Sequence, residues 1–340
     1  MAVSIFMNNR ATVIIPNYNG IKYIEICMDA LEGQNYKEFE TIVIDNASQD
    51  GSDRIVEEKY PWAKLVRNEE NTGFSRAVNQ GIELAETEYV ILLNNDTEVH
   101  PDYVGELVKA IDEDERIFSV SSKMISFKDR DLMDDAGDMY TLLGWSAQRG
   151  VAQSIEKYNK KKNVFTACAG AAIYRKKIFD EIGVFDVKHF AYLEDLDVGY
   201  RARIQGYRNV FCPTAIVWHI GSATSGSRYN DFKVSISARN NVYLIYKNMP
   251  LLQVIMNICP LLLGTLVKYL TFVKWGFGDS YKRGLKEGLK TKKECKKVPF
   301  RWKNFGHYVK IQLELTANTF IYVADYFKRA AVKRKIKNGY

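Results

Sequence analysis

Two short stretches of the sequence place a carboxylate and an imidazole where they could bind a metal ion. The apolar run YVILL stops abruptly at Asn94, Asn95 and Asp96, and the run IVW stops at His219. A hard divalent ion held by one carboxylate, one imidazole and phosphate oxygens is chemically reasonable. An ordinary Asn/Asp turn and a surface or core histidine are the alternatives. The 123 residues that separate Asp96 from His219 leave this choice open.

A third stretch, YLEDLDVGYRARIQG at 192–206, predicts a helix with carboxylates crowded into its first turn. Its apolar residues recur at helical spacing and a glycine ends it. The helix dipole favours negative charge at Glu194, Asp195 and Asp197, so a purely structural role is open. Asp197 can pair with Arg201 four residues on. Asp195 and Asp197 point to nearly opposite sides, so one can serve structure while the other faces a cleft as a general base.

The elements that would carry these residues alternate as in a βαβ protein. Strands are expected at 11–16, 39–45, 63–67 and 89–93, with helices at 21–31, from about 50 towards 60, and at 73–85. A strand buried on both faces reads as a continuous apolar run, and ligands of such folds bind beyond the carboxyl ends of the strands. The polar residues after position 93 would therefore face a binding site. The two commonest phosphate-binding loops, GxGxxG and GxxxxGK[ST], are absent.

The second half of the chain is less regular. Residues 125–163 are rich in Asp, Gly and Lys and predict a surface loop or a substrate-specific insertion. Order returns at 165–175, where small residues let a ligand or backbone come close, and 209–218 is a further strand candidate.

Length and composition bound the class of protein. A chain of 340 residues allows one large α/β domain with an appendage, or two domains. With 46% hydrophobic and 26% charged residues, wholesale disorder is excluded. Five cysteines without a CxxC pair indicate reduced thiols in a cytosolic setting and argue against a structural zinc site. The stretch MAVSIFMNNRATVII lacks the features of a signal peptide.

The charge is divided between a mildly acidic body and a basic tail. Residues 268–340 hold 19 Lys and Arg against 5 Asp and Glu, whereas the first 267 residues hold 29 against 36. Such a tail predicts contact with a polyanion, either anionic lipid or nucleic acid. Aromatic residues among the charges, such as Trp302, keep the nucleic-acid interpretation open.

An uncharged stretch at 248–267 precedes this tail. Its 20 residues match the length of a membrane span, but Pro250, Pro260 and Gly264 interrupt it. A single span would also place the basic tail across the membrane from a cytosolic body, contrary to the positive-inside tendency. An interfacial or re-entrant element on a membrane surface fits better. A buried core helix or a dimer contact is the alternative.

Several motifs, in order along the chain, resemble those of one family. VIIPNYNG, IVIDNASQDGS, NEENTGFSRAVNQGI, LLNNDTE, GVFDVKHFAYLEDLDVGYRARIQGYR and VWHIGS are similar to family 2 glycosyltransferases, most of all to the rhamnosyltransferase and galactofuranosyltransferase branch that builds bacterial cell-surface polysaccharides. The resemblance runs from about 12 to 250. It implies an α/β GT-A fold, a Rossmann-like mixed sheet with flanking helices, over a catalytic domain at 1–247. Within it, 11–98 would bind the nucleotide sugar and 120–225 the acceptor. Residues 248–340 would form a C-terminal helical, basic, membrane-associating region.

The resemblance also implies roles for single positions. The donor nucleotide and its diphosphate would meet Pro16, Asn17, Asn19, Asp45, Asn71, Gly73 and Arg76, with the first three in one loop and Asp45 on the base or ribose.

The remaining positions concern the metal and the reaction. Asn94-Asn95-Asp96 takes the place of the family's DxD motif, and Asn at its first position leaves Asp96 as the main carboxylate for Mg²⁺ or Mn²⁺. His219 matches the histidine that completes the metal shell. The pair Glu194-Asp195 matches the ED motif, whose Asp deprotonates the acceptor hydroxyl. Direct displacement at the anomeric carbon with inversion is then the implied reaction.

The implied partners are a nucleoside-diphosphate sugar and a saccharide or lipid-linked glycan acceptor, with the enzyme peripheral on the cytoplasmic face of the cell membrane. The donor expected first is dTDP-L-rhamnose, followed by UDP-linked galactofuranose, glucose or galactose. A polyprenyl-phosphate sugar synthase and a nucleotidyltransferase are rival enzymes, a catalytically dead scaffold is a further alternative, and a nucleic-acid-binding protein is the rival from another class. Residues 309–327 would form a dimerising or a membrane-surface helix. We expect no nucleic-acid partner.

Overall fold

The structure is a computed structural model that describes residues 9–221 and 229–337, with side chains described up to 327. Three expectations fall partly outside these residues. They concern the N-terminal stretch examined for a signal peptide, the end of the acceptor side at 222–225 and the last residues of the basic tail.

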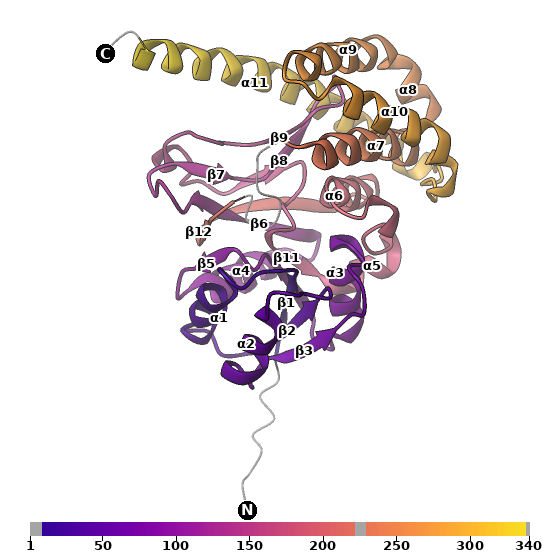
Figure 1. Ribbon diagram of the computed structural model, residues 1–340. Helices are drawn as coiled ribbons and strands as arrows, with labels where there is room; N and C mark the ends of the chain where they lie inside the picture. Colours follow the sequence, from indigo (N-terminus) through magenta and orange to yellow (C-terminus); the bar gives the residue numbers. More distant parts are fainter. Residues whose placement is uncertain (1–8, 222–228, 338–340) are drawn as a thin grey trace, which may run out of the picture.

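A ten-stranded mixed sheet forms the centre of the molecule (Figure 1). Its main path is β10-β12-β6-β11-β4-β1-β2-β3, with β5 paired to β12 and β7 to β6. The strands are β1 (Ala11–Asn17), β2 (Phe39–Asp45), β3 (Lys64–Arg67), β4 (Tyr89–Leu93), β5 (Thr97–Val99), β6 (Ile117–Ser126), β7 (Met133–Asp135), β10 (Lys162–Val164), β11 (Ala171–Arg175) and β12 (Arg208–His219). The sheet contains all the predicted strands, and those at 39–45 and 89–93 match to the residue.

Two apolar cores cover the two faces of this sheet. In β1, Val13 and Ile15 pack with α1 and α4 in one core, whereas Ile14 packs with α3 and α6 in the other. The helices of this half are α1 (Ile24–Glu32), α2 (Ser52–Lys59), α3 (Phe74–Leu84), α4 (Tyr103–Asp112), α5 (Lys176–Ile182) and α6 (Glu194–Ile204). Burial on both faces is why the strands read as continuous apolar runs. It also leaves polar side chains to the strand ends.

Part of the region expected to be a surface loop is buried strand. Besides β7, it contains the hairpin of β8 (Asp138–Tyr140) and β9 (Ser146–Gln148). Met133, Ala136 and Tyr140 in this region are at most 1% exposed. The surface-loop prediction was therefore wrong for 133–140, because strands of three residues are too short to leave a periodic pattern.

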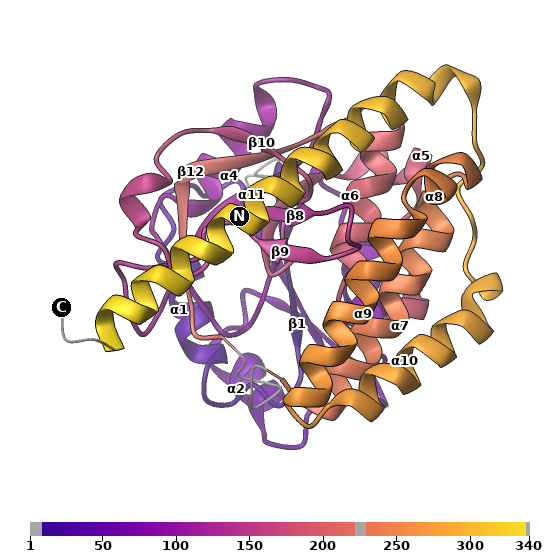
Figure 2. The same ribbon diagram turned by 90° about the horizontal axis from the view of Figure 1, so that it is seen from above.

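Five α-helices account for most of the described chain after residue 229. They are α7 (Asp231–Asn248), α8 (Leu251–Met256), α9 (Ile258–Lys274), α10 (Gly278–Thr291) and α11 (Phe305–Lys337). Helices α7 to α10 form a bundle beside α6, and α11 crosses over β8 and β9 (Figure 2). One apolar cluster joins Tyr200 of α6, Leu244 of α7 and Ile311 of α11. The C-terminal helices thus share a core with the helix of the ED pair.

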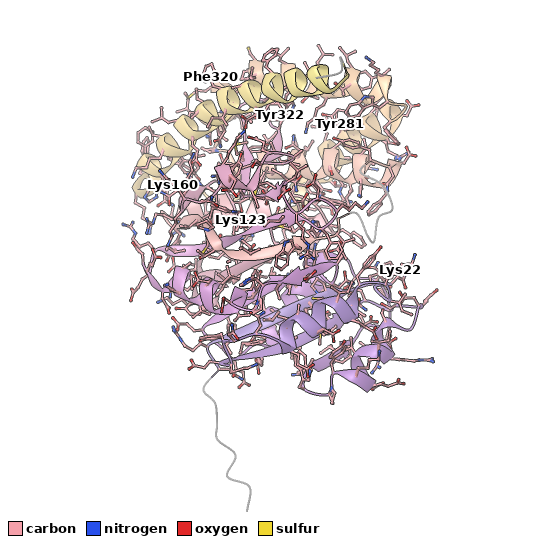
Figure 3. The ribbon with its side chains drawn as sticks, turned by 90° about the vertical axis from the view of Figure 1, so that its left-hand side faces the viewer. Lys22, Lys123, Lys160, Tyr281, Phe320 and Tyr322 are labelled. Atoms are coloured by element: carbon pink, nitrogen blue, oxygen red, sulfur yellow. The ribbon has the colours of Figure 1, made fainter. Side chains whose placement is uncertain are left out.

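The apolar stretch at 248–267 lies on the surface. Leu251 is 70% exposed and Leu262 is 64% exposed, so the alternative of a buried core helix was wrong for most of this stretch. Over the residues that the structure describes, no helix has the length and apolar character needed to cross a membrane. On α11, Phe320 points outward and Tyr322 lies on the inner side, where its ring meets Trp145 (Figure 3).

Candidate active site

The carboxyl ends of β1, β2 and β4 carry a buried polar network. In-register pairing of β1 and β2 sets Asn17 beside Asp45, and Asn17 Nδ2 donates to Asp45 Oδ1 over 2.7 Å. Asn95, just beyond β4, donates to Asn17 Oδ1 over 2.6 Å. Gly20 packs so closely here that a Cβ would come within 2.3 Å of both amide side chains. Three of the predicted donor residues therefore meet at one edge of the sheet.

Ser48 joins the two loops at this edge. Its hydroxyl donates to Asp45 Oδ1 and accepts from the Asn19 backbone N–H, and its own N–H reaches Asp45 Oδ2. Asn19 Oδ1 in turn accepts from the Gln49 N–H over 2.9 Å. Pro16 lies within β1 one residue before Asn17. The loops that follow β1 and β2 are thus held as one unit.

The second predicted donor loop lies before α3. Asn71 Oδ1 accepts from the Gly73 N–H, and Gly73 adopts a φ of 82° that favours glycine. A Cβ at Gly73 would come within 2.5 Å of the Phe190 ring. Arg76 is exposed in the first turn of α3, and among the described residues it forms no hydrogen bond or ion pair with the other predicted site residues. This loop therefore contacts the segment before α6, and its hydrogen bonds to the Asn46 side chain also connect it to the end of β2.

Asp96 and His219 meet although they are distant in sequence. Antiparallel pairing of β12 with β5 sets His219 opposite Thr97, and Asp96 Oδ1 lies 3.5 Å from His219 Nε2. The other ring nitrogen, Nδ1, lies 2.6 Å from Asp134 Oδ2. Burial lowers the pKa of His219, but the contacts with Asp134 and Asp96 outweigh it and raise that pKa to about 10.

These side chains fit a divalent ion. Metal-binding histidines usually donate the second ring N–H to a carboxylate, which fixes the tautomer and orients the ring. Asp134 is placed to accept that N–H, and this leaves Nε2 facing the Asp96 carboxylate. Carboxylate oxygen and imidazole nitrogen are both ligands for Mn²⁺, and the carboxylate also suits Mg²⁺.

The two carboxyls of the ED pair differ in their surroundings. Asp195 is partly exposed and accepts from the N–H groups of Ala169 and Leu196. Burial raises the pKa of Asp195, and these N–H groups oppose the rise. Glu194 is only 6% exposed. Its burial, and to a smaller extent the negative charge of Asp195, hold the pKa of Glu194 well above its usual range. Asp195 is therefore the accessible carboxylate of the pair.

The segment that delivers Asp195 is strained and held by α7. Phe190, Tyr192 and Leu193 have φ of 63°, 70° and 66°, conformations that cost about 1–3 kcal/mol each. Asn240 Nδ2 donates to the backbone carbonyls of His189, Ala191 and Tyr192 over 2.9, 2.9 and 2.7 Å. Since Asn240 is fully buried, these bonds fix the path of the chain into α6.

Asp197 has the structural role expected of one carboxylate in this turn. It is fully buried and accepts from Arg201 Nε, Lys247 Nζ and Asn248 Nδ2. The predicted pairing with Arg201 is confirmed at 3.0 Å.

Sequence reasoning missed three residues of this site. Asp134 lies in the region predicted to be a loop, Asn240 lies in α7 without a motif around it, and Ser48 was given no role at the site. A cavity of about 570 Å³, lined among others by Arg203 and His307, contains none of the predicted site residues.

The comparisons with known proteins name the family. The family model for glycosyl transferase family 2 matches residues 12–183, about half of the chain, and the chain belongs to this family. It is a glycosyltransferase, as the motifs predicted. The enzyme N-acetylglucosaminyl-diphospho-decaprenol L-rhamnosyltransferase of Mycobacterium tuberculosis is 24% identical over 243 residues, 65% of this chain and 79% of that protein. Glycosyltransferase GlyA of Streptococcus pneumoniae is 27% identical over 53% of this chain, which spans only 26% of GlyA.

The solved structures establish the fold. Mannosyltransferase PcManGT from Pyrobaculum calidifontis, in complex with GDP-Man and Mn²⁺, has a TM-score of 0.53 at 17% identity, over 93% of this chain and 87% of that one. The expected α/β GT-A fold, with a mixed sheet and flanking helices, is confirmed.

Proposed function

We propose that this protein transfers a sugar from a nucleoside-diphosphate sugar to a saccharide or lipid-linked saccharide, with inversion and with the help of a divalent ion. The observation that carries this proposal is the 3.5 Å approach of Asp96 Oδ1 and His219 Nε2 at the carboxyl end of the sheet. The polar network of Asn17, Asp45 and Asn95 lies at the same edge. Ligands of open α/β sheets bind there.

Most of the predicted site residues would bind the donor, and two would bind the metal ion. We assign Pro16, Asn17, Asn19, Asp45, Asn71, Gly73, Arg76, Asn94 and Asn95 to the donor. Asp96 and His219 would hold Mg²⁺ or Mn²⁺, which would stabilise negative charge on the departing diphosphate.

Asp195 would act as the general base, with Glu194 beside it. Its carboxylate takes the proton of the acceptor hydroxyl while the acceptor oxygen bonds to the anomeric carbon and the bond to the diphosphate breaks. Two backbone N–H groups orient this carboxylate, and burial raises its pKa toward the working pH, which suits a base.

We take dTDP-L-rhamnose as the first donor to test and UDP-linked hexoses or galactofuranose as the next. The rhamnosyltransferase relative supports this order. We further propose 1–247 as the catalytic domain and 248–340 as a region that docks on the cytoplasmic face of the membrane, where a lipid-linked acceptor would lie.

The surface of α8 to α10 supports membrane docking. Leu252, Leu262 and Leu266 are at least 52% exposed. Lys282 lines a groove together with Leu262 and Leu266, so positive charge and apolar side chains share one face. Anionic lipid attracts such a surface.

A nucleotide-release assay tests the reaction. Purified protein with Mg²⁺ or Mn²⁺ would be given dTDP-rhamnose, UDP-galactofuranose, UDP-glucose, UDP-galactose or UDP-GlcNAc, with chelator controls. We expect metal-dependent release from one donor, lost in Asp96→Ala and retained in Asp180→Asn, which alters an exposed carboxylate on α5. If no donor is hydrolysed and neither UDP nor dTDP binds in the presence of metal, the proposal is wrong.

A vesicle assay tests the docking surface. The protein should sediment with anionic vesicles but not with neutral ones, and high salt should weaken binding. Leu262→Asp with Leu266→Asp should abolish it, whereas Leu84→Asp on α3 should not. Binding to DNA instead of vesicles, or dimerisation lost in the double variant, would contradict membrane docking.

A further inference from the structure

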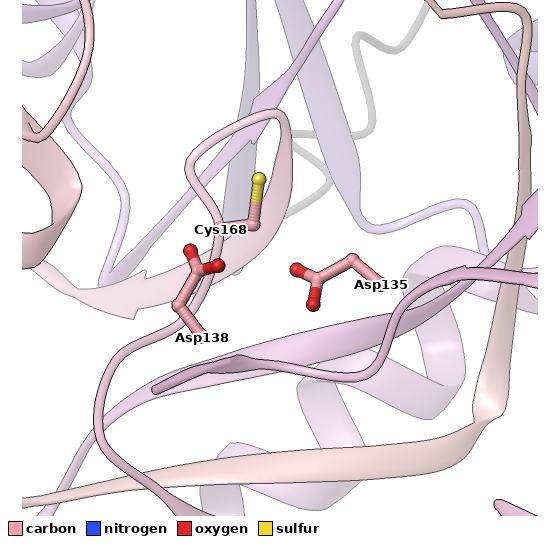
Figure 4. A group of neighbouring side chains, drawn as sticks. All are labelled: Asp135, Asp138 and Cys168. Atoms are coloured by element: carbon pink, nitrogen blue, oxygen red, sulfur yellow. The ribbon is translucent and has the colours of Figure 1, made fainter. Parts of the chain in front are cut away.

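Away from the Asp96–His219 pair, three ligand-type side chains gather on the acceptor side of the site. Asp135 ends β7, Asp138 begins β8 and Cys168 lies in the loop before β11. One ligand atom from each lies within 4.8 Å of the other two. Figure 4 shows the two carboxylates turned toward each other, with Cys168 on the neighbouring loop. Asp134 and Asp135 point to opposite sides of β7, so only Asp135 joins this group.

Asp135 is the observation that points to a ligand. It is 0% exposed, and neither of its carboxylate oxygens has a hydrogen-bond partner among the described residues. Asp138 is 9% exposed. Buried carboxylates without partners cost several kcal/mol, so native structures usually provide a donor or a cation.

Among the described residues no cation forms an ion pair with Asp135, although the charge of Arg149 acts on it from a distance. The nearest guanidinium, that of Arg149, donates to the Ala136 carbonyl. It lies 5.0 Å from the Tyr158 ring and 5.1 Å from the Phe211 ring, between the two aromatic side chains. The other charged groups that act on Asp135 include the carboxylates of Asp134 and Asp195, which add negative charge. The group therefore concentrates negative charge that a bound cation would balance.

We propose that Asp135, Asp138 and Cys168 form a second metal site, which takes a divalent ion of borderline softness such as Zn²⁺. Two carboxylate oxygens and one thiolate are ligands of this kind, and water can complete a tetrahedral shell. Cys168 is a free, partly exposed cysteine. On binding, the metal–sulfur bond replaces the S–H bond and the proton passes to solvent. The absence of a CxxC pair argued against structural zinc, but that spacing does not test a site in which two of the three ligands are carboxylates.

Such an ion would act on the position of Asp195. The loop of Cys168 also carries Ala169, whose N–H donates to Asp195 Oδ2. A metal held by that loop and by β7 and β8 would fasten the two segments to each other. The inference concerns a structural ion and stands without the proposed transfer reaction.

Cobalt is the probe for this site. Full-length protein titrated with Co²⁺ should develop the near-ultraviolet charge-transfer absorption of a cobalt–thiolate bond, which should saturate at one thiolate-bound ion per chain. Cys168→Ser should remove this absorption, and Asp138→Asn should weaken cobalt binding by about tenfold or more. Asp96→Ala should retain the absorption because the Asp96–His219 pair contains no sulfur. Cys259→Ser, which changes an exposed cysteine, is the matched control.

A folded parent protein without the charge-transfer band would overturn the proposal, as would a band that survives Cys168→Ser. If Cys168→Ser fails to fold, the parent still gives an answer. Alkylation of the parent protein would then be followed by peptide mapping. Zn²⁺ should slow the alkylation of Cys168 and leave the alkylation rate of Cys259 unchanged. Equal alkylation of Cys168 with and without Zn²⁺ would show that no metal binds there.

Discussion

His219 Nδ1 lies 2.6 Å from Asp134 Oδ2, and this contact determines which ring nitrogen faces Asp96. Asp134 belongs to β7, and His219 ends β12 on the other side of β6. A carboxylate that orients the imidazole in this way makes the free nitrogen a better ligand.

Replacing Asp134 should therefore weaken metal binding. For Asp134→Asn we expect the affinity for Mn²⁺ to fall about 10–100-fold, since the ring loses its anionic acceptor. Calorimetric titration with Mn²⁺ in the presence of nucleoside diphosphate measures this. The control is Asp131→Asn, an exposed carboxylate three residues earlier. Equal affinities of parent and Asp134→Asn would show that the contact does not support metal binding.

Asp195→Asn should nearly abolish transfer while leaving donor binding intact. General-base help contributes about 10²–10⁴ in rate, and the amide cannot take a proton. Steady-state kinetics with the donor found by nucleotide release would give kcat, and calorimetry would give the donor Kd. Near-parental kcat in Asp195→Asn, with Asp180→Asn as control, would remove Asp195 from the role of base.

Asn240→Ala should lower kcat more than donor affinity. The variant frees three carbonyls of a strained segment, so Asp195 should shift from its position, and such shifts cost about 10²-fold in rate. Asn240→Asp keeps the size of the side chain but lacks its N–H donors, so it should show the same loss of kcat. A parental kcat in both variants, or a loss of kcat matched by an equal loss of donor affinity, would contradict a positioning role.

Asp197 should make the protein sensitive to acid. Burial alone would raise its pKa, but Arg201 and Lys247 outweigh burial and hold the pKa well below its usual range. The stabilisation is therefore complete above the unfolded pKa of about 3.9 and is lost as the pH falls below that value toward the lower folded pKa. At pH 7, Asp197→Asn should lower the free energy of unfolding by about 3–5 kcal/mol, because two cations lose their buried partner.

Urea unfolding at pH 7 and pH 3 measures this effect, with Asp180→Asn as control. His189 affects the stability of the protein over a higher pH range than Asp197 does. Burial lowers its pKa to about 4, so the unfolded chain alone binds a proton below about pH 6.5, and stability falls from there towards pH 4. An Asp197→Asn variant as stable as the parent at pH 7 would show that the ion pair adds nothing.

Local patterns predicted much of the N-terminal half. The strands at 39–45 and 89–93 are runs of apolar residues long enough to be recognised, and the polar residues after them do lie at the sheet edge. The pairing of Asp197 with Arg201 also followed from helical spacing alone. The roles of the donor residues rest on motif resemblance and stay predictions until tested.

The sequence by itself therefore determined the longer strands and helices of the N-terminal half, the family motifs and the residues that end those strands, because these depend on neighbours in the chain. Tertiary structure alone decided that His219 meets Asp96, through the register of β12 with β5, and that Asp134 orients the ring. It also decided that Asn240 holds the segment before Asp195, and that Asp135, Asp138 and Cys168 come together. These contacts join residues far apart in sequence, and strand register and core packing bring them together without leaving a local pattern.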